Sequence, residues 1–125
     1  MKNLIKALLF ACLILQAGCV TSNQLMRQMI SVTDTIDGQE YVVSARVGED
    51  GKFSNSTTTG DRTQTISGQV TKSDDNYEVA IDYNSTRVNT PGFRKIGATV
   101  YLQEGESQEL GGVGNDIVYI RISSE

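Results

Sequence analysis

The chain has 125 residues, of which 11 are basic and 15 acidic, and it contains one proline but neither histidine nor tryptophan. Because histidine is absent, Ser-His-Asp and Cys-His catalytic sites and histidine-based metal sites are excluded. The formal net charge is −4, and Arg94-Lys95 is the one pair of adjacent basic residues, so nucleic acid and anionic lipid surfaces are poor partners on electrostatic grounds.

The first 18 residues are predicted to be a cleaved export signal. Met1–Lys6 supplies two positive charges, Ala7–Leu15 supplies nine apolar residues, and small residues lead up to Cys19. Basic, apolar and small segments in this order are typical of a secretory signal peptide. A membrane-spanning helix needs about 20 apolar residues, so the segment is too short to be one. Its removal takes away Lys2 and Lys6, which leaves nine basic residues against 15 acidic ones, a net charge of about −6.

The residues before the expected cleavage site, Leu15-Gln16-Ala17-Gly18-Cys19, resemble the lipobox of bacterial lipoproteins. The resemblance implies that the Cys19 thiol receives a diacylglyceryl group, that a dedicated peptidase cuts just before it, and that the new amino terminus is acylated as well. Stable attachment takes at least two acyl chains, which such a cysteine provides. The family usually has an apolar residue three places before the cysteine, where this chain has Gln16. The alternative is an ordinary cleaved signal, which would leave a soluble periplasmic protein.

Cysteine usage favours the lipid anchor. Cys12 would leave with the signal, so Cys19 would be the single cysteine of the mature chain. Exported domains of this size commonly hold an even number of cysteines as disulfides. Val20 after the cysteine resembles lipoproteins that are sorted to the outer membrane. We therefore expect a protein held on the cell envelope through Cys19, on the outer membrane and facing the periplasm.

Residues 19–38 are interpreted as the lipidated N-terminus and a tether, followed by a single β-domain over residues 39–125. Within the tether, the apolar residues of 25–30 have helical spacing, whereas residues 30–36 alternate between inward and polar positions as a strand would. Periodicity alone cannot decide between the two in so short a stretch.

Beyond residue 38 the sequence predicts strands separated by short turns. Residues 77–83 give the cleanest signal, because apolar or aromatic residues alternate there with Glu78, Ala80 and Asp82. Residues 52–59 are polar except for Phe53, which predicts either a weak edge strand or a mobile loop. The expected strands cover residues 41–47, 52–59, 64–71, 77–83, 96–103, 107–110 and 116–122, with a glycine-rich corner at 111–114.

Turn signals every eight to twelve residues, without long helical segments between the strands, favour an all-β fold. We expect a small antiparallel β-sandwich or barrel of about six to seven strands.

Residues 98–113 carry a second, local resemblance. Their strand, polar turn with glycine, short strand and Gly-Gly pair look like a stretch near the C-terminal end of the secretin core, and the preceding strand at 77–83 with the linker to Arg94 fits the same order loosely. Secretins are outer-membrane pore subunits of secretion systems and type IV pili. A whole secretin is several times longer and has periplasmic ring domains, so the resemblance favours an envelope β-protein and no more.

Carboxylates are the remaining candidates for catalysis or metal binding. Glu49-Asp50 and Asp74-Asp75 both fall in predicted hairpin turns, where aspartate is common for backbone reasons. We therefore expect no catalytic residue, no cofactor and no metal site.

The five tyrosines are the best candidates for a contact surface, because tyrosine supplies rigid amphipathic area at interfaces. Tyr77 and Tyr83 are expected in the core, whereas Tyr101 lies on the polar face of its strand and is the candidate for an exposed contact.

Three hypotheses about function follow. The leading one is a non-enzymatic envelope lipoprotein that binds or supports another envelope component, for example a secretion or pilus assembly. The second is a small-ligand-binding or inhibitor module displayed on the membrane. The third, an enzyme that uses only carboxylates and hydroxyls, is the least favoured.

Overall fold

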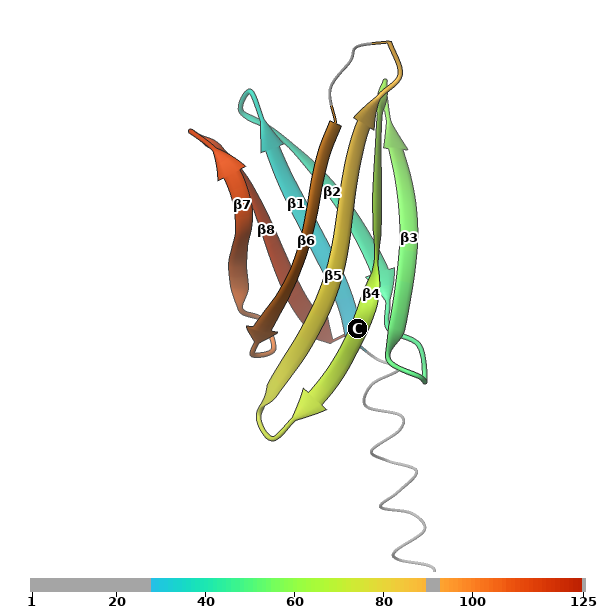
Figure 1. The fold of residues 1–125 in the computed structure, drawn as a ribbon, viewed down its shortest axis with the longest axis vertical. Coiled ribbons are helices and arrows are strands. Elements are labelled where there is room, and N and C mark those ends of the chain that lie inside the picture. The colour runs from blue at the N-terminus through green and yellow to red at the C-terminus, as the bar shows by residue number, and fades with distance from the viewer. Residues whose placement is uncertain (1–27, 90–92, 125) are drawn as a thin grey trace, which may run out of the picture.

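The computed structural model describes residues 28–89 and 93–124, which form two four-stranded antiparallel sheets (Figure 1). The all-β prediction is thus confirmed, and the architecture is that of a small β-sandwich with eight strands rather than six or seven. The strands are β1 (Gln28–Ile36), β2 (Gln39–Arg46), β3 (Lys52–Thr59), β4 (Arg62–Ser73), β5 (Asn76–Arg87), β6 (Phe93–Leu102), β7 (Ser107–Val113) and β8 (Asp116–Ser124).

The strand order is β2-β1-β8-β7 in the first sheet and β3-β4-β5-β6 in the second. Strands that follow one another in the chain pair as hairpins, except that the chain changes sheet between β2 and β3 and again between β6 and β7. The pairing of β1 with β8 brings the first and last strands together in the middle of the first sheet (Figure 1).

The strand interpretation of residues 30–36 is the right one, and the tether predicted for residues 19–38 reaches too far into the domain. Gln28–Ile36 forms β1, which pairs with β2 on one side and with β8 on the other. Ile30 and Val32 are fully buried. Two neighbouring strands satisfy the backbone of β1, and its alternate residues reach the core, so tertiary pairing decides what the local pattern left open.

The glycine-rich corner predicted at residues 111–114 is also corrected. Gly111–Val113 continues β7 and pairs with β8, and the turn follows at Gly114-Asn115. Gly112 has φ +156°, and a Cβ there would collide with the carbonyl oxygen of Asp116. Glycine at this position permits the close approach of two backbones rather than a corner.

Residues 52–59 form a strand and not a loop. All eight residues of β3 pair with β4, at the edge of the second sheet. Phe53 is its one buried apolar side chain. The edge-strand interpretation is therefore confirmed.

The core lies between the inner faces of the two sheets. On β5 the predicted alternation is confirmed, since Tyr77, Val79, Ile81 and Tyr83 are buried while Ala80 and Asp82 are exposed. The buried apolar residues come from strands of both sheets and form one cluster.

No helix among the described residues has the length and hydrophobicity that crossing a membrane requires.

The sandwich has two ends with different connections (Figure 1). We call the end where β1 begins and β8 finishes the N-terminal end; the connections at residues 47–51, 74–75 and 103–106 lie there. The opposite end, which we call the far end, has the connections at residues 37–38, 60–61 and 114–115, and β5 ends and β6 begins there.

Candidate functional site

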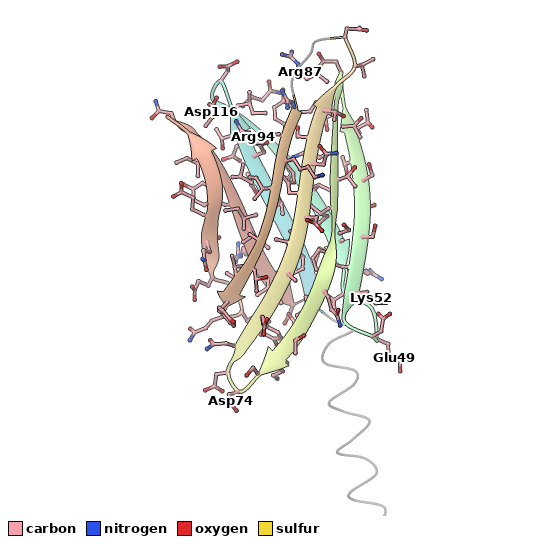
Figure 2. The ribbon with its side chains drawn as sticks, viewed as in Figure 1. Glu49, Lys52, Asp74, Arg87, Arg94 and Asp116 are labelled. Carbon is pink, nitrogen blue, oxygen red and sulfur yellow. The ribbon has the colours of Figure 1, made fainter. Side chains whose placement is uncertain are left out.

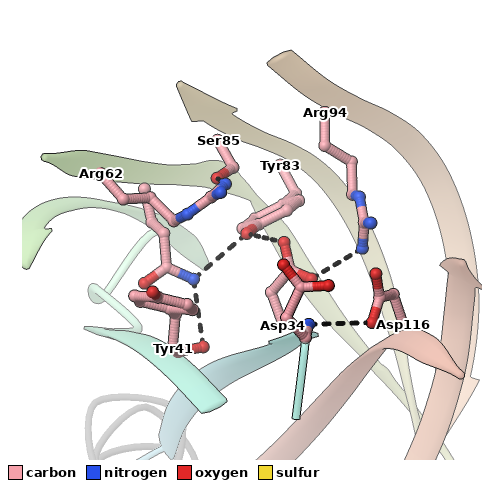
Figure 3. A network of polar contacts seen from close by, with 9 residues as sticks. Asp34, Tyr41, Arg62, Tyr83, Ser85, Arg94 and Asp116 are labelled. Carbon is pink, nitrogen blue, oxygen red and sulfur yellow. Dashed lines mark hydrogen bonds and ion pairs between the residues drawn. The ribbon is translucent and has the colours of Figure 1, made fainter. Parts of the chain in front are cut away.

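At the far end the space between the sheets is filled by polar side chains instead of apolar ones (Figure 3). The inward-facing positions of β1 run from Ile30 and Val32 to Asp34, and those of β4 run from Ile66 back to Gln64. The members of this polar network are Asp34, Tyr41, Arg62, Gln64, Tyr83, Ser85 and Arg94.

Asp34 is the centre of the network and has no exposed surface. The Tyr83 hydroxyl donates to its Oδ2 at 2.7 Å, and Arg94 Nη1 donates to its Oδ1 at 2.7 Å. Both partners belong to the second sheet, while Asp34 belongs to the first. A buried carboxylate is tolerated only when it is paired, so these two bonds link the sheets where apolar packing ends.

Gln64 extends the link to the edge of the first sheet. Its Nε2 donates both to the Tyr83 hydroxyl and to the main-chain carbonyl of Tyr41, each at 3.1 Å. The pKa of Tyr83 is raised from 10.0 to about 12. Burial is the largest cause of this rise, and the hydrogen bond to Asp34 is the second. The phenol therefore stays protonated at neutral pH and keeps its role as donor to Asp34.

Arg62 is almost entirely buried, with 9% of its surface exposed. Its Nη1 donates to Ser85 Oγ at 2.7 Å, and its Cζ lies 5.2 Å from the centre of the Tyr41 ring. No ion pair joins Arg62 to a carboxylate within residues 28–89 and 93–124. In the same part of the chain, Arg62 Nε and Gln64 Oε1 are buried without a hydrogen-bond partner. The site therefore holds a desolvated positive charge, one free donor and one free acceptor.

Two more arginines accompany Arg62 at the far end. Arg87 is its cross-strand partner on β5, and Arg94 lies opposite Ser85 on β6. Arg87 pairs with Asp61 at 3.3 Å, with both side chains about half exposed. Like charges directly opposite each other on a sheet repel, so the Arg62–Arg87 pair is unfavourable unless a counter-charge lies close to both.

Sequence reasoning missed this network, although a signal for it exists. Asp34 and Gln64 both occupy inward positions in the alternation of their strands, and Ser85 does so two residues after Tyr83. A polar residue at an inward position needs a buried partner. Continuing each alternation to the strand end would have identified the network members, but not which of them pair.

The predicted contact residue Tyr101 lies on the outer face of β6, opposite Glu78 on β5, and is 61% exposed. Its exposure is confirmed, whereas its contact role stays a prediction. Cys19, the predicted lipidation site, lies outside the described residues.

The two acidic pairs lie in connections at the N-terminal end, as Figure 2 shows for Glu49 and Asp74. Asp50 Oδ1 accepts a hydrogen bond from the main-chain nitrogen of Lys52, and Asp74 has φ +52°, so the aspartates serve the turns. The described part of the chain contains no group of three or more residues placed to hold a metal ion.

An open depression lies on the outer face of the second sheet. Gly97 and Ala80 form part of its floor, because they carry little or no side chain, and Lys52 and Asp82 contribute charges to its lining. It faces away from the core and so is separate from the polar network.

No protein-family model, curated protein or solved structure matches this chain.

Proposed function

We propose that this chain is a lipid-anchored envelope protein, on the outer membrane and facing the periplasm, that binds or supports another envelope component without catalysing a reaction. The observation that carries the proposal is the lipobox-like segment that ends at Cys19, nine positions before β1 begins. At about 3.3–3.6 Å per residue, the segment between them reaches at most about 30 Å. The sandwich would therefore stay close to the membrane.

The charges of the N-terminal end support a defined orientation. Its three connections carry six acidic residues and no basic one: Glu49, Asp50, Asp74, Asp75, Glu104 and Glu106. Anionic headgroups repel such a surface. With the anchor attached at this end, the far end would point away from the bilayer, toward possible partners.

The absence of histidine, together with the use of Cys19 as the anchor, supports a non-enzymatic role. The acidic pairs are placed in turns, and the buried Asp34 is already paired with Arg94. These groups support a role in binding or in structure better than one in acid–base chemistry.

The anchor is tested with Cys19→Ser, and Cys12→Ser inside the signal is the matched control. Cys19→Ser should yield unprocessed precursor or a released form, while Cys12→Ser should be processed and anchored as the wild type is. Cell fractionation, metabolic labelling with a fatty acid and intact-mass measurement report the outcome. A Cys19→Ser protein that still fractionates with membranes at the mature mass of the wild type would contradict the proposal.

The free edge of β3 is the place where we expect a protein partner to add a strand. One edge of β3 is paired with β4; at the other, Asn55 Nδ2 donates to the main-chain carbonyl of Ser44 on β2 at 2.6 Å. The two strands belong to different sheets, so β3 has backbone groups available to an extended chain. The secretin resemblance makes a secretion or pilus component a reasonable partner.

Hydrogen exchange of the mature protein tests the edge. A partner captured from detergent-solubilised envelope by cross-linking should slow amide exchange at residues 54–60. Amides of the centrally placed β5 serve as the control, because they are already paired on both sides. Protection elsewhere, with 54–60 unchanged, would rule out edge pairing.

A further inference from the structure

We propose that the far end of the sandwich binds the C-terminal carboxylate of a peptide chain at Arg62, with Arg87 as a second cation. This deepens the binding role proposed above, since it names the chemistry of the partner group. It concerns a site other than the β3 edge, and it does not depend on the anchor at Cys19.

Arg62 carries a buried positive charge that no carboxylate pairs with in residues 28–89 and 93–124. A guanidinium removed from water is normally paired with a carboxylate, because desolvation penalises the unpaired charge heavily. Arg62 is about nine-tenths buried, yet its partners are a neutral hydroxyl of Ser85 and the ring of Tyr41. An anion at this position would supply the missing counter-charge.

The free edge of the guanidinium indicates which anion fits. Tyr41 lies over the Arg62 guanidinium, and Ser85 occupies Nη1. Nε and Nη2 remain, and together they form the edge on which the two oxygens of a carboxylate bind in parallel. Nε is buried and lacks an acceptor. Since water does not reach Nε in the unliganded structure, we expect binding to move the Arg62 side chain.

Gln64 narrows the choice of carboxylate. Its Oε1 is buried and has no donor, and it lies two residues from Arg62 on the same face of β4. A ligand that satisfies both residues offers an acceptor to Arg62 and an N–H donor to Gln64. The terminal residue of a peptide has both, because its own amide N–H lies next to the carboxylate.

The neighbouring charges favour an anion as well. Arg62 and Arg87 are direct cross-strand partners, and Arg94 lies on the next strand, while Asp34 and Asp61 supply two carboxylates. Asp61 pairs with Arg87 and Asp34 pairs with Arg94, so within residues 28–89 and 93–124 Arg62 is the arginine of the three without a carboxylate partner, and a bound carboxylate would supply it. Figure 2 shows Arg87 and Arg94 at the end of the molecule opposite Glu49 and Asp74.

The test is an NMR titration of the mature protein in detergent, observing the arginine Nε–H signals. The probe is N-acetyl-Ala-Ala with a free C-terminus. The Arg62 Nε–H signal should shift downfield on binding, and the C-terminal amide of the same peptide should leave it unchanged. Acetate, which lacks the N–H, should bind more weakly. No shift with the free-acid peptide, or an equal shift with its amide, would overturn the proposal.

Two further experiments distinguish a peptide carboxylate from inorganic phosphate as the ligand, and the contribution of Arg62 to binding from that of Arg87. Inorganic phosphate that binds as well as the peptide would overturn the assignment to a carboxylate. Arg62→Lys keeps the charge but loses the fork and should weaken peptide binding about tenfold. The exposed Arg87→Gln should weaken it less and should fold normally, whereas Arg121→Gln on the outer face of β8 should leave it unchanged. Peptide binding that is unaffected by both Arg62→Lys and Arg87→Gln would also refute the site.

Discussion

Removing the Asp34 carboxylate should destabilise the fold more than any other single change at the far end. Asp34 is fully buried and accepts hydrogen bonds from Tyr83 and Arg94, both at 2.7 Å. Asp34→Ala leaves a buried phenol without its acceptor and a guanidinium without its counter-charge. Breaking a buried ion pair costs about 3–5 kcal/mol. Because the Arg94 side chain is 24% exposed and can be partly hydrated, we expect the lower half of that range.

Asp34→Asn should cost less than Asp34→Ala. The amide fills the same volume and its oxygen can still accept from Arg94, but its nitrogen replaces the oxygen that accepts the Tyr83 hydroxyl proton, so the charge and that one acceptor are lost. A hydrogen bond to a charged group contributes about 1.5–3 kcal/mol, and we expect a loss in that range. For a domain of this size each kcal/mol lowers the Tm by roughly 4–8 °C.

Urea unfolding followed by far-UV circular dichroism measures both variants, since the chain has no tryptophan. The exposed carboxylate Asp61, which pairs with Arg87 at the same end, provides the control, and Asp61→Ala should cost less than about 1 kcal/mol. In an Arg94→Ala background Asp34→Ala should cost less than in the wild type, because no guanidinium is left unpaired. If Asp34→Ala costs no more than Asp61→Ala, the network does not link the sheets as described.

Two further predictions concern β5. Ile81→Ala should lower the free energy of unfolding by about 2–5 kcal/mol because it leaves a cavity in the core. Asp82→Ala on the exposed face should lower it by less than about 0.5 kcal/mol. Equal losses in urea unfolding would contradict the observed alternation. Burial raises the pKa of Tyr83 to about 12 in the folded chain, so its contribution to stability is complete below about pH 10, the unfolded value, and is lost as the pH rises toward 12. Over that interval the wild type should lose roughly 2–3 kcal/mol more than Tyr83→Phe, and parallel pH profiles of the two proteins would show that the phenol is not buried as described.

Local features of the sequence determined much of the fold. A strand repeats every two residues, so alternation alone located β5 and assigned Val79 and Ile81 to the core. Glycine and aspartate marked several turns for the same local reason, since they tolerate positive φ at low cost. The exposure of Tyr101 followed from its place in the alternation of β6.

Tertiary structure decided what depends on residues far apart in the chain. The ambiguous segment around Ile30 became a strand because β8, at the opposite end of the sequence, pairs with it. Gly112 continued a strand rather than turning because the Asp116 backbone lies against it. Asp34 and Arg94 are 60 residues apart, and a periodic pattern carries no information about which buried carboxylate meets which guanidinium. Local periodicity determines which way a side chain points, but only the packing of the two sheets determines what it meets there.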